Sequence, residues 1–222
     1  MRLPKLDAPV LADPILRRQA IDLQDDFEID DVAVDGGTVD GSSGRGGRLR
    51  FSLLRELTLA GKRLDGVALT DVVLDRVDLT AANLTGASLR RVSLADCRCL
   101  AVDLAEAHLL GVRFTACAVE MANLRFVKMQ RVVFEKCAMS SADFGSATLT
   151  DVVFKDCQLE EAVFAGARLR GVSFSGSRLG GIKGLVDLRG ATISLEQLIV
   201  IAPALAAELG IELEETPGDH WR

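Results

Sequence analysis

The 222-residue sequence predicts an all-β solenoid, a coil with four five-residue sides and therefore twenty residues in each turn. Three observations predict this fold. An apolar residue recurs at every fifth position from Leu59 to Leu179, a small residue precedes it by two places, and residues twenty positions apart are alike. A period of five fits neither the 3.6-residue repeat of a helix nor the two-residue repeat of a strand. The chain must therefore turn a corner in every repeat.

Residues spaced twenty apart form columns in such a coil, because each turn stacks on the previous one at about 4.8 Å. One column contains valines, one contains cysteines and one is rich in alanine. Their members are Val72, Val92, Val112, Val132, Val152 and Val172; Cys97, Cys117, Cys137 and Cys157; and Ala82, Val102, Ala122, Ala142 and Ala162. The central residues Phe114, Phe134, Phe154 and Phe174 share one face and predict an aromatic ladder, with Phe144 and Phe164 on the preceding face.

The phase of the repeat sets the expected domain boundaries. The coil spans residues 29–193 in about seven to eight turns, and the phase slips by one residue near Gly180–Gly181. Residues 29–48 form weak first turns, because the stretch from Gly36 to Gly47 offers small inward residues and could be coil or loop. Residues 1–28 are an N-terminal cap with a short helix within Ile15–Leu23.

The other end of the coil is expected to carry a helical cap over residues 194–211. Ser194 and Gln197 form a capping-box pattern, Pro203 should kink or split the helix, and Gly210 should end it. The apolar residues of this helix can cover the coil or meet a second copy, and they include Leu195, Leu198, Ile199, Ile201, Leu205 and Leu209. Residues 212–222 are a tail.

Composition limits the cellular setting and the chemistry. The longest uncharged apolar stretch, Leu198–Ala207, is too short to span a bilayer, and the N-terminus has no secretory signal pattern, so we expect a cytoplasmic protein without membrane contact. The five cysteines are expected to be reduced and to act as small apolar residues. His108 points outward without nucleophilic partners, and Gly44–Gly47 lacks the lysine of a phosphate loop. We therefore expect no enzymatic activity, no cofactor and no metal.

Several segments resemble the A(D/N)LXX unit of the pentapeptide-repeat family: Ala82-Asn83-Leu84-Thr85-Gly86, Ala122-Asn123-Leu124 and Ala142-Asp143-Phe144. The resemblance implies a right-handed quadrilateral β-helix in a bacterial protein. It also implies a homodimer formed through the C-terminal helix. Members of this family confer quinolone resistance by binding DNA gyrase or topoisomerase IV through a DNA-like acidic surface, so the resemblance implies such a partner here. Residues 51–193 contain 18 basic and 16 acidic residues, so this coil lacks that acidity. Topoisomerase binding is therefore the second hypothesis, resting on the resemblance alone.

The first hypothesis is a non-catalytic scaffold that binds a protein through the outer faces of its coil. The face centred on Leu49, Leu69, Leu89, Leu109, Met129, Leu149 and Leu169 is called the basic face. Its outward residues include Arg48, Arg50, Arg90, Arg91, Lys128, Arg131, Arg168 and Arg170. A candidate apolar contact patch comprises Leu100, Leu110, Met121 and Phe126. A third hypothesis is that the basic face binds a nucleic acid or another polyanion in a salt-dependent manner.

Overall fold

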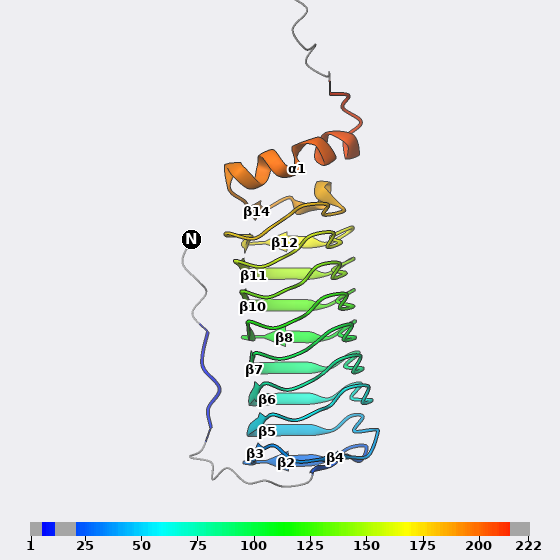
Figure 1. Cartoon of the computed structure of the whole chain (residues 1–222), viewed down its shortest axis with the longest axis vertical. Helices are drawn as coiled ribbons and strands as arrows, with labels where there is room; N and C mark the ends of the chain where they lie inside the picture. Colours follow the sequence, from blue (N-terminus) through cyan, green and yellow to red (C-terminus); the bar gives the residue numbers. More distant parts are fainter. Residues whose placement is uncertain (1–5, 12–20, 214–222) are drawn as a thin grey trace, which may run out of the picture.

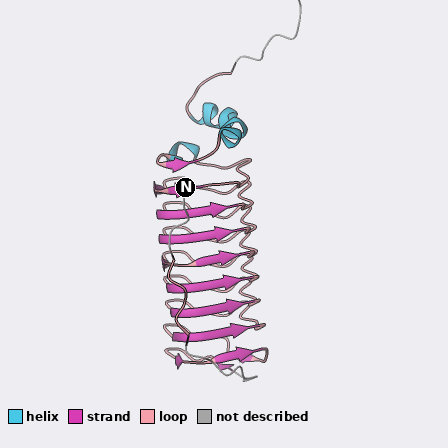
Figure 2. Cartoon of the chain, turned by 90° about the vertical axis from the view of Figure 1, so that its left-hand side faces the viewer, coloured by secondary structure: helices cyan, strands magenta, loops and turns pink. Residues whose placement is uncertain are grey.

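The computed structural model describes residues 6–11 and 21–213, and it is a right-handed four-sided β-solenoid of about nine turns (Figure 1). The number of turns exceeds the predicted seven to eight. The regular repeat from position 29 to position 179 accounts for the predicted turns, and residues 21–23 and 185–193 add to the coil below and above it. Figure 2 shows the strands of successive turns stacked along the long axis, with the helix at one end.

The strands form one long parallel sheet and one short parallel pair. They are β1 (Ile21–Asp22), β2 (Glu28–Asp30), β3 (Ala33–Asp35), β4 (Val39–Asp40), β5 (Arg48–Arg55), β6 (Ala68–Asp75), β7 (Ser88–Ala95), β8 (His108–Leu110), β9 (Arg113–Thr115), β10 (Lys128–Glu135), β11 (Thr148–Lys155), β12 (Arg168–Arg170), β13 (Val172–Ser173) and β14 (Ala191–Thr192). Leu49 pairs with Leu69, and Leu69 pairs with Leu89. The twenty-residue register predicted from the sequence is thus confirmed.

The long strands run along two sides of the coil and turn the corner between them. That corner lies at Asp71 in β6 and at Arg91 in β7, both of which have positive φ values, 55° and 51°. The other two sides hold isolated bridges such as Asn83 with Asp103 and Arg98 with Ala118. Outward side chains therefore form straight columns along the rod, because each turn repeats the cross-section of the one below.

Phenylalanine rings fill the C-terminal half of the interior. The rings of Phe114 and Phe134 stack with centroids 4.6 Å apart, and those of Phe134 and Phe154 stack at 5.2 Å. Phe144 meets Phe154 edge to face at 5.6 Å. The ladder is as predicted, but the second column lies on the opposite side of the coil rather than on the preceding one, since ten residues are half a turn.

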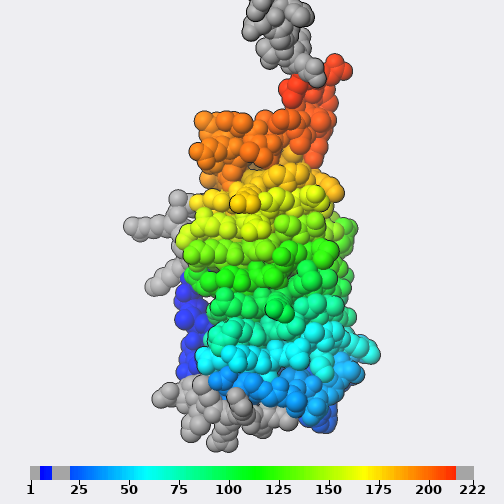
Figure 3. Space-filling model, viewed as in Figure 1, coloured from blue at the N-terminus to red at the C-terminus, as the bar shows by residue number. Residues whose placement is uncertain are grey.

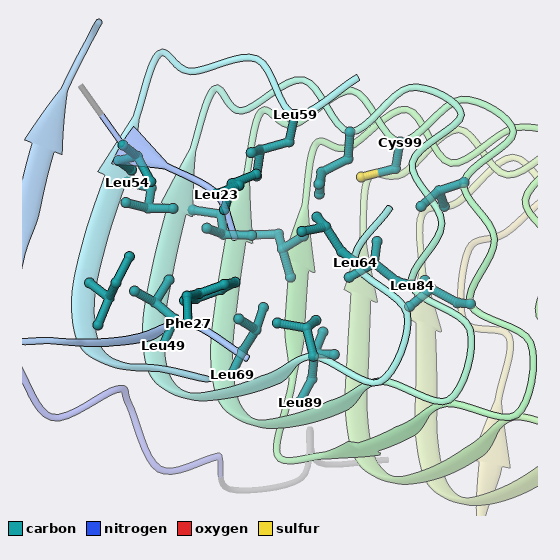
Figure 4. A pocket seen from close by; sticks show the side chains of 18 of the residues that line it. Leu23, Phe27, Leu49, Leu54, Leu59, Leu64, Leu69, Leu84, Leu89 and Cys99 are labelled. Carbon is teal, nitrogen blue, oxygen red and sulfur yellow. The ribbon is translucent and has the colours of Figure 1, made fainter. Parts of the chain in front are cut away.

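Leucines line the N-terminal half of the interior and leave an apolar cavity of about 60 Å³ (Figure 4). Leu64, Leu84 and Leu89 are among the side chains around it. Because these aliphatic side chains replace the stacked rings found further along the rod, the coil is less completely filled here. The predicted packing therefore leaves space in this part of the interior.

The first full turn is coil rather than loop. The Gly44 N–H donates to the Arg63 carbonyl at 2.8 Å, and Ser43 bridges to Arg63 in parallel. The Phe27 ring occupies the space that a larger residue at Gly44 or Gly47 would need, because a Cβ at Gly47 would lie 2.1 Å from that ring. The weak inward positions are therefore filled from below by a residue of the predicted cap.

The predicted N-terminal helix within Ile15–Leu23 differs from the structure in its last residues. Ile21–Asp22 is strand β1, which pairs with β4 through Ile21 and Val39, so backbone pairing with the first turn overrides the helical spacing. Residues 12–20 and the predicted tail from position 214 lie outside the described residues.

The C-terminal end of the coil slips in phase by one residue as predicted, because Val172 pairs with Ala191, nineteen residues later, but the slip lies beyond Lys183, which still bridges to Val163 twenty residues earlier. A short 3-10 helix, η1 (Leu185–Leu188), buries Leu185 and leaves Val186 exposed, so the inward residue differs from the one the pattern indicates. Helix α1 (Leu195–Glu208) follows, with the expected capping box at Ser194. Pro203 lies inside this one helix and does not split it.

Gln197 joins helix α1 to the last turns of the coil. Its side-chain amide donates to the carbonyls of Phe174 and Ser177, both at 2.6 Å. These carbonyls face the open end of the stack, where another turn would otherwise supply donors. The capping glutamine therefore also satisfies the end of the coil. No helix in the described ranges is long and apolar enough to cross a membrane.

Candidate interaction surface on the basic face

All eight predicted basic residues lie on one face of the rod, spread over four strands. Arg48 and Arg50 are in β5, Arg90 and Arg91 in β7, Lys128 and Arg131 in β10, and Arg168 and Arg170 in β12. The parallel register aligns these strands, so residues that are 120 positions apart in sequence share a single surface.

Three of the eight are held by carboxylates twenty residues earlier in the sequence. Arg48 pairs with Glu28 at 2.7 Å, and Arg50 makes two hydrogen bonds to Asp30, at 2.7 and 2.6 Å. Arg91 donates through two nitrogens to Asp71, and the Nε–Oδ1 distance is 2.7 Å. The Arg50 hydrogen bonds hold the pKa of Asp30 below its usual range. These pairs were not predicted from the sequence, although the twenty-residue spacing is the signal that identifies them.

The other five cations make no ion pair with any residue in the described part of the chain: Arg90, Lys128, Arg131, Arg168 and Arg170. Lys128 stands between His108 and Thr148, and Arg170 stands beside Thr150. An open groove runs over β7, β8, β10 and β11, and its lining includes Arg90, Lys128 and Arg170. This half of the basic face therefore presents positive charge to solvent.

Residues 6–11 lie along the edge of the basic face, at the corner near Asp71, Arg91 and Gly111. Figure 3 shows this blue segment against the side of the rod. The Val10 N–H donates to Asp71 Oδ1 at 3.1 Å, and Leu6 and Asp7 face the coil near Arg91 and Gly111. The prediction from the sequence placed these residues in an N-terminal cap. A six-residue extended segment has no periodicity that would have predicted this position.

The buried carboxylate of Asp71 is the most completely enclosed charge on this face, with 1% of its side chain exposed. The Arg91 hydrogen bonds, followed by the Val10 N–H, hold the pKa of Asp71 below its usual range despite burial. In turn, the hydrogen bonds to Asp71 raise the pKa of Arg91, and the charge of Asp7 adds to the effect. The pair is thus a fixed part of the corner.

The four predicted apolar contact residues occupy different positions around the coil. Leu110 lies on the basic face, half-buried beside Leu6. Leu100, Met121 and Phe126 are exposed, by 37%, 57% and 50%. The centroid of the Phe126 ring lies 5.5 Å from the guanidinium carbon of Arg125. Leu100 and Met121 share one corner in successive turns, but Leu110 and Phe126 lie at other corners of the cross-section, so the four do not form one patch.

Helix α1 places its predicted apolar residues on two surfaces. Ile201 is buried and Leu205 half-buried, and both face a groove against η1 that Leu198 and Leu209 also line. Leu195 and Ile199 point away and are 72% and 66% exposed, as is their neighbour Val200 at 61%. The helix therefore covers the coil with one surface and leaves a second apolar surface in solvent.

The cysteines lie inside the coil as the spacing predicted. All five are buried and unpaired, and burial raises the pKa of the Cys99 thiol. The Cys97 and Cys117 thiols donate to backbone carbonyls, such as Cys117 to Thr115 at 3.4 Å. Among residues 6–11 and 21–213, no cluster of three or more His, Cys, Asp or Glu side chains is placed to hold a metal. These thiols therefore pack as part of the core.

The family model for pentapeptide repeats (eight copies) matches residues 82–117, and that for the pentapeptide repeat region matches residues 127–193. A search of the curated proteins found no match.

Two solved structures illustrate the similarity. HetL, a pentapeptide repeat protein involved in heterocyst differentiation regulation from the cyanobacterium Nostoc sp. strain PCC 7120, is 22% identical over 79% of this chain and 91% of its own, with a TM-score of 0.39. Full-length QnrB1, a plasmid-mediated fluoroquinolone resistance protein, is 18% identical over 89% of this chain and 99% of its own, with a TM-score of 0.39. With the repeats that the family models match and the twenty-residue register of the coil, the chain belongs to the pentapeptide-repeat family.

Proposed function

We propose that this protein is a non-catalytic, cytoplasmic scaffold that binds a partner protein through the basic face. The observation that carries the proposal is the division of that face. Arg48, Arg50 and Arg91 are neutralised by carboxylates, whereas the five other cations have no such partner in residues 6–11 and 21–213, and three of them, Arg90, Lys128 and Arg170, line an open groove. Unpaired charge on a rigid surface raises the encounter rate with a partner of opposite charge and selects its orientation.

The partner expected on this face is acidic. Two cations of the groove, Lys128 and Arg170, lie in different columns and two turns apart, so a partner must present carboxylates over a span of about 10 Å to meet both. The threonines between them, Thr148 and Thr150, add hydroxyl groups that can donate hydrogen bonds to such carboxylates.

The test is a pull-down from a bacterial lysate with the wild-type protein and the double variant Lys128→Glu/Arg170→Glu. The matched control is Lys136→Glu/Lys183→Glu, which makes the same change in net charge at exposed positions away from the groove. The proposal expects a protein that is retained by the wild type and the control but lost by the groove variant. If the groove variant retains every partner, the basic face is not the binding surface.

A homodimer through helix α1 is part of the proposed function. Leu195, Ile199 and Val200 are exposed on a helix whose charged residues are Glu196 and Glu208. Glu208 is already engaged, because it accepts hydrogen bonds from the N–H groups of Gly184 and Val186. An exposed apolar surface of this kind favours contact with a second copy.

Sedimentation equilibrium tests the dimer. Ile199→Glu should give a monomer, whereas Leu213→Glu, which changes an exposed leucine beyond the helix, should leave the mass unchanged. A wild-type protein that sediments as a monomer at micromolar concentration would refute this part of the proposal.

Binding of DNA gyrase or topoisomerase IV is a second candidate that rests on the family resemblance. The charge balance of residues 51–193, with 18 basic and 16 acidic residues, does not favour imitation of DNA. A supercoiling assay with purified gyrase, with and without the protein, tests this candidate directly. Direct binding of a polyanion is a third candidate, and the unpaired cations favour it. It predicts that affinity for duplex DNA falls steeply as salt increases.

A further inference from the structure

Residues 6–11 lie at a corner of the basic face and are not part of the stacked turns, because they pair with no strand of the coil. They run across the strands, since Leu6 lies near Gly111 and Val10 bonds to Asp71, two turns further down the rod. The Asp71 carboxylate accepts hydrogen bonds both from the Arg91 guanidinium and from the Val10 N–H. The coil thus presents a buried, oriented acceptor for the backbone of an extended segment.

The corner also has room for side chains of such a segment. Gly111 leaves a gap in the corner column between Arg91 and Arg131, because a Cβ there would have only Arg91 Cγ within 4 Å, at 3.9 Å. Gly111 has a φ of 66°, and it separates β8 from β9, whereas β7 and β10 continue through the same corner. Arg90, Arg91 and Arg131 surround this gap, and Arg90 and Arg131, unpaired within the described residues, give it a positive charge.

The segment that lies there fits the corner incompletely. A cavity of about 80 Å³ remains between Leu6 and Asp7 on one side and Leu110, Gly111 and Arg131 on the other. Asp7 makes no ion pair within 4.0 Å in the described residues, and Asp7, Ala8 and Val10 are exposed. Within those residues, a single hydrogen bond joins the segment to the coil, that from Val10. An attachment of this kind can be exchanged.

We propose that this corner is a binding site for an extended peptide segment that carries an acidic residue, that residues 6–11 occupy it in cis, and that an acidic segment of a partner protein replaces them. This inference rests on the proposed function, because it specifies what part of a partner binds the basic face. The ligand is a peptide rather than a nucleic acid, since Asp71 offers an acceptor to a backbone N–H, and a phosphodiester backbone has no such donor.

The cis segment controls access to the site. Nine residues separate Leu11 from Ile21, and a short tether holds a segment at an effective concentration on the order of millimolar. A free peptide at micromolar concentration therefore competes poorly with residues 6–11. A partner must bring additional contacts, such as those of the groove around Lys128 and Arg170, to displace them.

The experiment uses the full-length protein with its own segment disarmed by Leu6→Ser and Asp7→Lys. A fluorescein-labelled peptide with the wild-type sequence of positions 5–12 is titrated with this variant and with the wild-type protein, and anisotropy is recorded. We expect at least tenfold tighter binding to the disarmed variant. Adding Arg131→Glu should weaken binding at least tenfold, whereas Lys136→Glu, an equal charge change on another side, should leave it unchanged.

A charge exchange separates recognition from general attraction. The peptide with Asp7→Lys should bind the disarmed Arg131→Glu protein better than the wild-type peptide does. The inference is overturned if the wild-type peptide does not saturate the disarmed variant, if a scrambled peptide of the same composition binds equally well, or if duplex DNA binds this corner in preference to the peptide. Because Lys128 and Arg170 are unchanged here, this result is independent of the pull-down that tests the proposed function.

Discussion

Replacing Leu94 with phenylalanine should stabilise the coil, because it extends the aromatic ladder into the leucine half. Leu94 pairs in register with Phe114 and lines the apolar cavity of about 60 Å³. A ring at this position would lie one turn below Phe114, which already stacks on Phe134 at 4.6 Å. The substitution Leu94→Phe therefore adds a stacking partner and fills empty space at the same time.

The expected gain follows from the size of the cavity. Cavities cost about 24 cal/mol per Å³, so filling all of this one would contribute about 1.4 kcal/mol. A ring fills only part of it, but a stacked pair adds about 0.5–1.5 kcal/mol. We expect a net gain of about 1 kcal/mol in the free energy of unfolding. For a chain of this length, that raises the melting temperature by about 2–4 °C.

Differential scanning calorimetry of Leu94→Phe and of the matched variant Phe114→Leu provides the test. Phe114→Leu removes one stack and enlarges the same cavity, so its melting temperature should fall, at a cost of about 1–2 kcal/mol. A fall for Leu94→Phe as well would refute the reasoning. It would mean that the leucines cannot move aside for the ring, in which case overpacking costs about 1–3 kcal/mol.

Three further predictions concern the ends and the corner of the coil. Gly47→Ala should lower stability by about 1–3 kcal/mol in urea unfolding, because its Cβ meets the Phe27 ring, and Phe27→Leu should restore part of the loss. Gln197→Leu should cost about 2 kcal/mol, since two carbonyls at the open end lose their donor, and the exposed neighbour change Glu196→Gln should cost little. The lowered pKa of Asp71 predicts a stabilising contribution that is present above the ordinary carboxyl pKa of about 3.9 and is lost as pH falls through the lower folded value. Urea unfolding from pH 6 to pH 2 should show this loss in the wild type and a smaller one in Asp71→Asn; equal pH dependence would contradict the assignment.

The interior of the coil could be predicted from the sequence because each wall repeats every twenty residues. The cysteine column and the phase slip both follow from that spacing, and the pairing of Val172 with Ala191 confirms the slip, which lies between Lys183 and Ala191 rather than at Gly180. The column of Phe144 was predicted on the wrong side of the coil. Its position depends on how many sides separate it from Phe154 around the cross-section, and ten residues correspond to two of the four sides. The edge-to-face contact with Phe154 at 5.6 Å shows that the two columns face each other.

The ends and the added segment could not be predicted in the same way. Phe27 fills the space left by two glycines, seventeen and twenty residues later in the sequence. No repeating pattern in the sequence relates an aromatic residue to glycines that lack a side chain. Residues 6–11 contact the coil through one hydrogen bond and a few side chains, which leaves no periodic signal. These features depend on complementary shape, whereas the repeat depends on spacing.

The same columns decide which charges of the basic face are available to a partner. Where a carboxylate lies one turn below the cation in the same column, as with Glu28 and Arg48 or Asp71 and Arg91, the pair is neutralised at hydrogen-bond distance. Where the neighbour above or below is neutral, as Thr148 is for Lys128, the cation keeps its full charge in solvent. Salt screens such charges over about 8 Å, so a partner responds only to those that lie close to its own surface. The upper half of the basic face can therefore attract an acidic partner, while the lower half contributes to stability through its ion pairs.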